Sequence, residues 1–272
     1  MAFVSTPTGR IHYEVFDAVA PWYSSPETVL FQHGIGAHPG IWSEWLPALV
    51  DRYRVVRFDM RGSGRSTIPG PGFDWSLSVL ADDLLTVADA TDTQRFHVVG
   101  ESMGGTIALH VALEHASRVA SLTISNGADV GSPIRRVQEW ARQMDEGGVE
   151  AWSEGMMADR FHPDAIDGAR RDWYARQQAS WNRNSILDAL QVLRDTNLRA
   201  RLPEIRCPVL LMHGDGSPFI PVGVMAEMHA ALTDSRLQVF AHAKHGLPFS
   251  HARVCSAALR AFLDSVTGDA PS

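Results

Sequence analysis

Lysine is almost absent from this sequence. Lys244 is the single lysine among 272 residues, and arginine supplies the other positive side chains. Acidic residues outnumber basic ones, so the formal net charge at pH 7 is −7. Proteins that bind nucleic acid usually carry a basic patch or stripe. The charge therefore argues against nucleic acid as a partner.

Cysteines are few, and long apolar runs are missing. Two cysteines, Cys207 and Cys255, give no disulfide framework, and both are expected to be buried thiols. No stretch approaches the ~18 consecutive apolar residues that cross a bilayer. Residues 1–10 lack the basic start and apolar core of a signal peptide. We therefore expect a cytoplasmic protein that does not contact a membrane.

The sequence also lacks the patterns of common metal and phosphate sites. His242 and His245 have no carboxylate at ligand spacing. The run Gly62-Ser63-Gly64 lacks the lysine of a Walker loop. We expect no metal and no cofactor.

Short apolar runs alternate with helical patterns along most of the chain. This alternation is typical of an α/β fold, with a mostly parallel central sheet and helices on both faces. The predicted strands are 11–16, 29–32, 55–58, 96–99, 121–125, 209–212 and 237–240. The predicted helices of this core are 42–50, 77–90, 103–114 and 254–265.

The segment 131–201 has a different pattern. It lacks strand signals and predicts amphipathic helices at 134–145, 149–157, 162–180 and 186–195. It also holds Trp140, Trp152, Trp173 and Trp181, half of the eight tryptophans. We interpret it as a helical cap, with the core formed by 1–130 and 202–272. Ligands of open α/β sheets bind beyond the carboxyl ends of the strands, where such a cap would exclude water.

The most informative motif is Gly100-Glu101-Ser102-Met103-Gly104. It lies between a predicted strand and a predicted helix. A serine on a sharp, crowded strand-to-helix turn is typical of an exposed nucleophile, and small flanking residues relieve the crowding. The motif predicts Ser102 as the nucleophile.

A serine nucleophile requires a base and donors for the oxyanion. His245 follows the last predicted strand and precedes a glycine, which makes it a better base than His242 or His251. The oxyanion donors are predicted to be the backbone N–H groups of Met103 and Ile35. His33 is interpreted as a structural residue that braces the Ile35 loop.

With these pieces the chain resembles the α/β-hydrolase family over nearly its whole length. The resemblance rests on the serine motif, on His33-Gly34 and on the run 59–66, Asp-Met-Arg-Gly-Ser-Gly-Arg-Ser. It implies an α/β-hydrolase fold with a helical cap inserted after the sixth strand, counted as in that family. That strand corresponds to 121–125 here.

The acid of a catalytic triad is the point of departure. The family position, three residues beyond a glycine, holds Ser217 in the run His213-Gly214-Asp215-Gly216-Ser217. We prefer Asp215, which lies two residues earlier. Asp129, after the sixth strand, is a second candidate. The third is a Ser102–His245 dyad in which Ser217 only hydrogen-bonds the base.

The segment 124–133 and the Ser-Met-Gly-Gly turn are similar to those of 3-oxoadipate enol-lactonases. Those enzymes open an enol-lactone that bears a carboxylate, in aromatic catabolism. The resemblance implies a serine hydrolase of small carboxylic esters or lactones that works through an acyl-enzyme. Arg135 and Arg136 could pair with such a carboxylate, and Trp140 is a candidate for the substrate pocket.

Three alternatives stay open. They are a carbon–carbon bond hydrolase of ring-cleavage diketones, a cofactor-free non-hydrolytic enzyme, and a ligand-binding protein whose catalysis has decayed. The expected partner is a small-molecule substrate. A homodimer is left open as the assembly.

Overall fold

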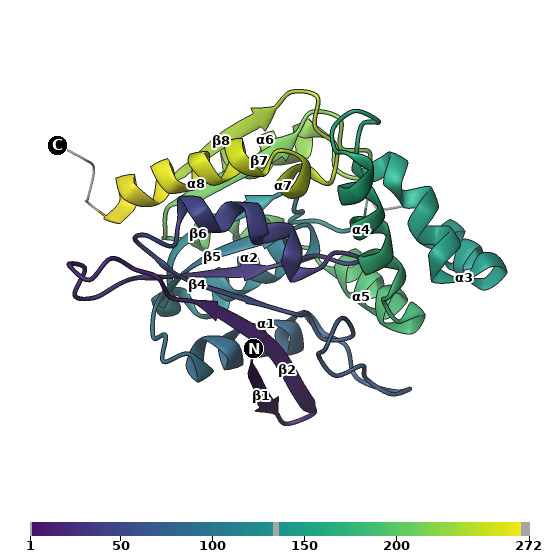
Figure 1. The fold of residues 1–272 in the computed structure, drawn as a ribbon, viewed down its shortest axis with the longest axis horizontal. Coiled ribbons are helices and arrows are strands. Elements are labelled where there is room, and N and C mark those ends of the chain that lie inside the picture. Colours follow the sequence, from purple (N-terminus) through teal and green to yellow (C-terminus); the bar gives the residue numbers. More distant parts are fainter. Residues whose placement is uncertain (1, 133–135, 268–272) are drawn as a thin grey trace.

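A computed structural model describes residues 2–132 and 136–267 of the protein. Its centre is an eight-stranded sheet in the order β1-β2-β4-β3-β5-β6-β7-β8 (Figure 1). The two antiparallel pairings are β1 with β2 and β2 with β4, and every other neighbouring pair is parallel. The strands are Ala2–Thr6, Gly9–Phe16, Thr28–Gln32, Arg54–Phe58, Phe96–Glu101, Val119–Ser125, Val209–Gly214 and Ser235–Phe240, numbered β1 to β8.

Helices cover both faces of this sheet because alternate strand residues point to opposite sides. Leu30 and Val98 belong to the core under α1 (Leu77–Ala90), α2 (Met103–Glu114) and α6 (Val222–Ala231). Their neighbours Phe31 and Val99 belong to the core on the other face. That face is covered by the 3-10 helix η1 (Pro39–Ala48) and by α7 (Leu247–Ser250) and α8 (Ala252–Thr267). Shorter 3-10 turns are η2 (Ala116–Arg118) and η3 (Arg199–Glu204).

Among the described residues, three α-helices lie between β6 and β7 in the chain. They are α3 (Val137–Arg160), α4 (Gly168–Ala179) and α5 (Arg183–Asp195), and Figure 1 shows them gathered at one end of the sheet. Gly148 has a left-handed φ of 74° and divides α3 into two helical pieces, as the sequence predicts. Asp167 and Asn182 cap α4 and α5 with their side chains. The helices α3, α4 and α5 therefore lie at the end of the sheet where ligands of such folds bind.

The structure corrects several predicted elements. β1 was not predicted, because Ala2–Thr6 is an edge strand with no fully buried residue. The helix α6 was missed as well, since it has no clear apolar stripe. The predicted helix 42–50 is a 3-10 helix that begins at Pro39. The predicted helix 162–180 begins only at Gly168, after the cap residue Asp167.

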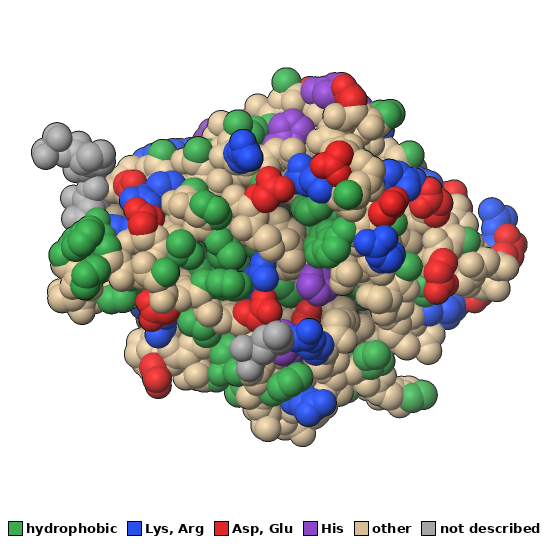
Figure 2. Space-filling view, in the orientation of Figure 1, with side chains coloured by type: hydrophobic (Ala, Val, Ile, Leu, Met, Phe, Trp, Pro, Cys, Tyr) green, Lys and Arg blue, Asp and Glu red, His purple; other side chains and the backbone are tan. Residues whose placement is uncertain are grey.

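On the face in Figure 2, acidic and basic side chains are interspersed. In the described part of the chain, no helix combines the length and apolar character needed to cross a membrane. Cys255 is buried, but Cys207 is half-buried, and its partial burial raises the pKa of the thiol to about 11.

Candidate active site

Ser102 lies on a strained turn between β5 and α2. Its φ of 54° and ψ of −121° are rare for a residue with a side chain. The Ser102 N–H donates to the carbonyl of Ser125, 2.9 Å away, which ties the turn to β6. A Cβ on Gly100 would overlap the backbone of Gly104. The close approach of strand and helix therefore explains why a glycine stands there.

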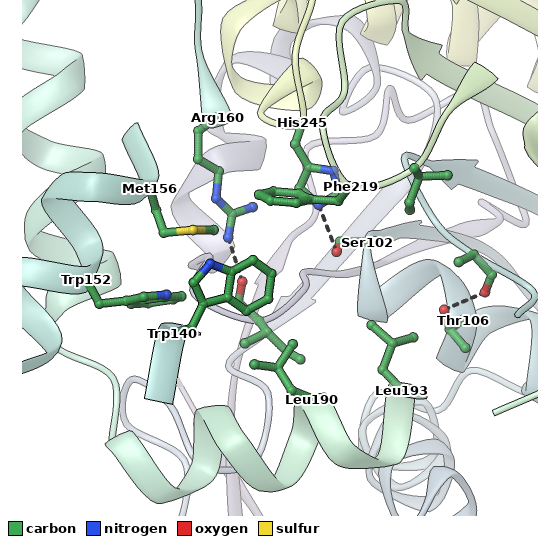
Figure 3. A pocket seen from close by; sticks show the side chains of 13 residues that line it. Ser102, Thr106, Trp140, Trp152, Met156, Arg160, Leu190, Leu193, Phe219 and His245 are labelled. Carbon is green, nitrogen blue, oxygen red and sulfur yellow. Dashed lines mark hydrogen bonds between the residues drawn. The ribbon is translucent and has the colours of Figure 1, made fainter. Parts of the chain in front are cut away.

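His245 is in hydrogen-bond contact with this serine. Its Nε2 lies 3.0 Å from Ser102 Oγ (Figure 3). Asn126 donates through Nδ2 to the His245 carbonyl at 2.9 Å and accepts the Gly214 N–H at 3.0 Å, which fixes the loop after β8 against β6 and β7. Burial, helped by the Arg160 cation and by His213, lowers the pKa of His245 well below its usual value. The imidazole is therefore neutral at pH 7, as a general base must be.

The other imidazole nitrogen faces a hydroxyl group. Ser217 Oγ lies 3.2 Å from His245 Nδ1. A carboxylate in this place can only accept, so it fixes the tautomer with the proton on Nδ1. A serine hydroxyl can donate or accept, and it carries no charge. It therefore orients the ring without stabilising an imidazolium as a carboxylate would.

The preference for Asp215 as the acid is not supported by the structure. The Asp215 carboxylate is exposed and accepts the N–H groups of His242 and Ala243, each at 3.1 Å. Burial alone would raise the pKa of this carboxyl, but these backbone hydrogen bonds outweigh it and lower the pKa. Asp215 thus braces the turn that precedes His245 through the backbone of that turn.

Asp129 is directed elsewhere as well. It is fully buried and forms an ion pair with Arg199, which also pairs with Glu227 at 2.6 Å. The Asp129 carbonyl accepts the Leu198 N–H at 2.8 Å. Asp129 therefore joins the end of β6 to the segment that re-enters the core. Of the three residues considered for the acid position, the structure places Ser217 on the base.

The Ile35 loop packs directly against the nucleophile. A Cβ on Gly34 would lie 2.7 Å from Ser102 Cβ. The Gly34 carbonyl is held by His33 Nδ1 at 2.9 Å and by the Ala37 N–H at 3.2 Å. Because a trans peptide is planar, the Ile35 N–H points opposite to that carbonyl. Met103 N–H begins α2, where a helix presents unpaired donors and positive potential.

His33 has the structural place expected for it. Its Nε2 accepts the Met60 N–H at 3.0 Å, so the proton resides on Nδ1 and is donated to the Gly34 carbonyl. Burial is the main reason why the pKa of His33 is lowered to about 4. The residue is therefore a neutral brace of the loop.

A small cavity lies over Ser102 and His245, between the sheet and the helices α3 and α5. Its volume of about 40 Å³ corresponds to roughly three water molecules. Most of its walls are apolar or aromatic. The lining residues are Ile35, Ser102, Thr106, Ala128, Trp140, Trp152, Met156, Arg160, Leu190, Leu193, Phe219, Ile220 and His245 (Figure 3).

Three buried nitrogen donors among the cavity-lining side chains have no hydrogen-bond partner. They are the indole N–H groups of Trp140 and Trp152 and the Nη1 of Arg160. A buried unpaired donor is costly unless water or a ligand accepts from it. The cavity is therefore suited to a molecule that offers oxygen acceptors.

The predicted substrate residues differ in where they lie. Trp140 lines the cavity, and Arg136 pairs on the surface with Glu139 and Asp159. Arg135 lies outside the described residues. Arg160, which sequence reasoning missed, is buried at the cavity. Its position at the end of a polar helix gives no sequence signal, because such arginines are usually exposed.

Within residues 2–132 and 136–267, no group of three or more His, Cys, Asp or Glu side chains is placed to hold an ion.

Comparisons with known proteins concern the family and the fold of the chain. Residues 27–252 match the family described as alpha/beta hydrolase fold. A putative carbamate hydrolase RutD from Klebsiella pneumoniae (strain 342) is 29% identical over 228 residues, which cover 80% of this chain and 84% of that protein. The same-named protein of Caulobacter vibrioides (strain NA1000 / CB15N) is 28% identical and covers 93% of this chain and 95% of its own.

Solved structures show the same fold. The enol-lactonase from Burkholderia xenovorans LB400 superposes with a TM-score of 0.88 at 22% identity, covering 96% of this chain and 99% of its own. At this identity the likeness concerns the fold alone. The match to the family model, in contrast, extends over most of the sequence. The chain therefore belongs to the α/β-hydrolase fold family and is an enzyme of that family.

Proposed function

We propose that the protein hydrolyses a small carboxylic ester or lactone through an acyl-enzyme on Ser102. The contact of 3.0 Å between Ser102 Oγ and His245 Nε2 carries this proposal. A serine hydroxyl is a poor nucleophile at pH 7, and a neutral imidazole in hydrogen-bond reach can remove its proton as it attacks.

The reaction then has two halves. In the first, Ser102 Oγ bonds to the substrate carbonyl carbon, and its proton passes to His245 Nε2. In this proposal, the N–H groups of Ile35 and Met103 hold the oxyanion. His245 returns the proton to the leaving oxygen, and the acyl-enzyme remains. In the second, His245 takes a proton from water as the water attacks the acyl carbon. The bond from that carbon to Ser102 Oγ then breaks, His245 gives the proton to Ser102 Oγ, and the acid is released.

The cavity supports a small, acceptor-bearing substrate. Trp140 and Trp152 offer indole N–H donors that have no hydrogen-bond partner, and aromatic walls surround them. Arg160 Nη1 also has no hydrogen-bond partner, although it lies 3.6 Å from Glu101 Oε1. We propose that the helices α3, α4 and α5, which lie within the segment 131–201, act as the cap that excludes water from this space. Proteins similar in fold or sequence carry the names enol-lactonase, esterase and putative carbamate hydrolase. The lactones, esters and carbamates in these names share a carbonyl group that a serine can attack.

A substrate panel tests the proposal. It contains p-nitrophenyl acetate, a five-membered lactone, phenyl carbamate and a vinylogous diketone, with Ser102→Ala as the control. We expect ester or lactone turnover that falls by about 10⁴ or more in Ser102→Ala, because the acyl-enzyme cannot form. If the Ser102→Ala variant retains its turnover, Ser102 is not the nucleophile.

Other outcomes favour the alternatives. Faster turnover of the diketone than of the ester would indicate a carbon–carbon bond hydrolase. Oxygen uptake with a heteroaromatic compound would indicate non-hydrolytic chemistry. A folded protein in which a fluorophosphonate probe leaves Ser102 unmodified would indicate a binding protein.

A further inference from the structure

A carboxylate lies beside the nucleophile, and the proposed reaction gives it no role. Glu101 precedes Ser102 at the end of β5 and is 1% exposed. Its Oε2 accepts the Gly34 N–H at 2.8 Å, and its Oε1 has no hydrogen-bond partner. Burying a carboxylate is costly, so a nearby positive charge or strong donors must compensate for it.

Two groups face the unpartnered oxygen. Arg160 Nη1 lies 3.6 Å from Glu101 Oε1, and His245 Nε2 lies 3.9 Å from the same atom. Arg160 is itself 3% exposed and is held by Gln178 Oε1 at 3.1 Å and by the Ile35 carbonyl at 2.8 Å. The arginine therefore cannot swing towards Glu101 without losing those hydrogen bonds. Glu101 Oε1 remains close to both cations that the site can contain.

The base needs a negative charge at one moment of the reaction. When Ser102 attacks, its proton moves to Nε2 and an imidazolium forms inside a buried site. In serine triads, a carboxylate on Nδ1 stabilises this cation. Here Nδ1 faces the neutral hydroxyl of Ser217 at 3.2 Å. The stabilising charge is therefore missing from its usual side of the ring.

We propose that Glu101 supplies this charge from the Nε2 side and so replaces the missing triad carboxylate. This inference rests on the proposed function. Glu101 takes no proton in the step, which passes from Ser102 Oγ to His245 Nε2 and then to the leaving oxygen. Burial raises the pKa of Glu101, and the Arg160 cation and the Gly34 N–H oppose this shift by favouring the ionised form that the proposal requires. The Gly34 N–H also fixes the position of the carboxylate. Glu101 is thus a positioning and charge-balancing residue that acts through His245.

The charges around His245 determine in which direction the rate and its pH dependence should change when Glu101 is neutralised. Glu101 faces it from β5, Arg160 from α3 and His213 from β7, while Ser217 is neutral. Removal of the Glu101 charge leaves Arg160 without its counter-charge, which disfavours the imidazolium further. The rate should fall, and the acid limb of the kcat/KM profile should move to lower pH.

A two-residue cycle tests the proposal with p-nitrophenyl acetate as the probe. Glu101→Gln keeps an acceptor for the Gly34 N–H and removes only the charge. We expect kcat/KM to fall about tenfold to a hundredfold. Ser217→Asp in the same molecule should restore most of this loss and move the acid limb back up. A purely structural glutamate predicts no such rescue, because residue 217 does not touch it.

Two results would overturn the proposal. One is a Glu101→Gln variant with wild-type kcat/KM, and the other is a loss that Ser217→Asp leaves unchanged. Ser217→Asp in the otherwise wild-type protein gives a second measurement, which does not require Glu101→Gln to fold. If Glu101 already supplies the charge, this change raises kcat/KM by less than about tenfold. A gain of a hundredfold or more would show that the base has no charge partner.

Failure of the proposed function gives a different pattern. In that case wild-type protein turns over no ester and a fluorophosphonate does not label Ser102. Failure of the inference alone leaves the wild type active and Ser102 labelled.

Discussion

The two sides of the His245 ring are built in different ways. On the Nε2 side, the turns after β3 and β5 are buried and packed so closely that Gly34 and Gly100 have no room for a side chain. On the Nδ1 side, the loop after β7 is largely exposed, and Asp215 points to a neighbouring turn. The nucleophile side is thus fixed by steric close approach, and the opposite side by a few polar contacts.

This difference indicates which functional residues can be inferred from the local sequence and which cannot. Steric close approach permits few residue types, so it leaves a motif. Polar contacts in an exposed loop depend on where each side chain points. Asp215 and Ser217 lie two residues apart, yet Ser217 alone contacts the base. Three predictions test whether the two sides respond as differently as they are built.

The largest effect is expected on the packed side. Gly100→Ala would place a Cβ against the backbone of Gly104 and displace the nucleophile turn. A shift of about 1 Å can cost a hundredfold in rate, and overpacking costs about 1–3 kcal/mol of stability. We expect at least that loss in p-nitrophenyl acetate turnover, together with a lower Tm by calorimetry.

The matched control is Gly155→Ala, an exposed helical position with nothing within 4 Å of the added carbon. This variant should keep wild-type turnover and gain up to ~1 kcal/mol of stability. Equal turnover of the two variants would contradict the steric account of the turn.

A pH effect of intermediate size is expected from His33 on the same side. Its pKa is about 4 in the folded state and about 6.5 when unfolded, so between these values the unfolded chain binds the extra proton. Its contribution is complete above pH 6.5 and is lost as the pH falls towards 4, on the order of 3 kcal/mol in total.

Thermal unfolding of wild type and His33→Asn from pH 7.5 to 4.5 measures this effect. The Tm advantage of the wild type should shrink as the pH falls. A constant difference over that range would show that His33 is not a buried neutral brace.

The smallest effects are expected in the loop after β7. Ser217→Ala removes one neutral hydrogen bond to His245 Nδ1 and should lower kcat about fivefold to tenfold, with KM unchanged. Asp215→Asn, its control two residues away, should keep kcat within about threefold because its side chain contacts the preceding turn. A tenfold loss in Asp215→Asn alone would return the acid role to Asp215.

Much of the fold was predictable because it depends on local patterns. The helices α1 and α2 have the predicted bounds, and seven predicted strands lie within observed ones. Residues of β1 were missed because an edge strand buries too little to show a continuous apolar run. The family and the hydrolase class also followed from motifs.

The residues of the candidate site also fall into two groups, those that the sequence predicts and those that it does not. Ser102, His245, Ile35 and Met103 follow from chain order, because the carboxyl ends of parallel strands meet at one edge of the sheet. Arg160, Glu101 and Asn126 had no readable signal. Arg160 resembles a surface arginine, Glu101 lies at a position that the Gly-x-Ser-x-Gly pattern leaves unspecified, and Asn126 resembles a turn residue. Each acts through a partner more than fifty residues away in the chain.

The nucleophile turn, the order of strands and helices along the chain, and the absence of a carboxylate at position 217 follow directly from the amino-acid sequence. The set of side chains that surrounds His245 follows only from how the folded chain brings distant segments together. Steric close approach between neighbouring segments permits only a few residue types at each position, so it leaves a recognisable motif in the sequence. The direction of a carboxylate or a guanidinium is set by the burial and charge of distant segments, which exist together only once the chain has folded.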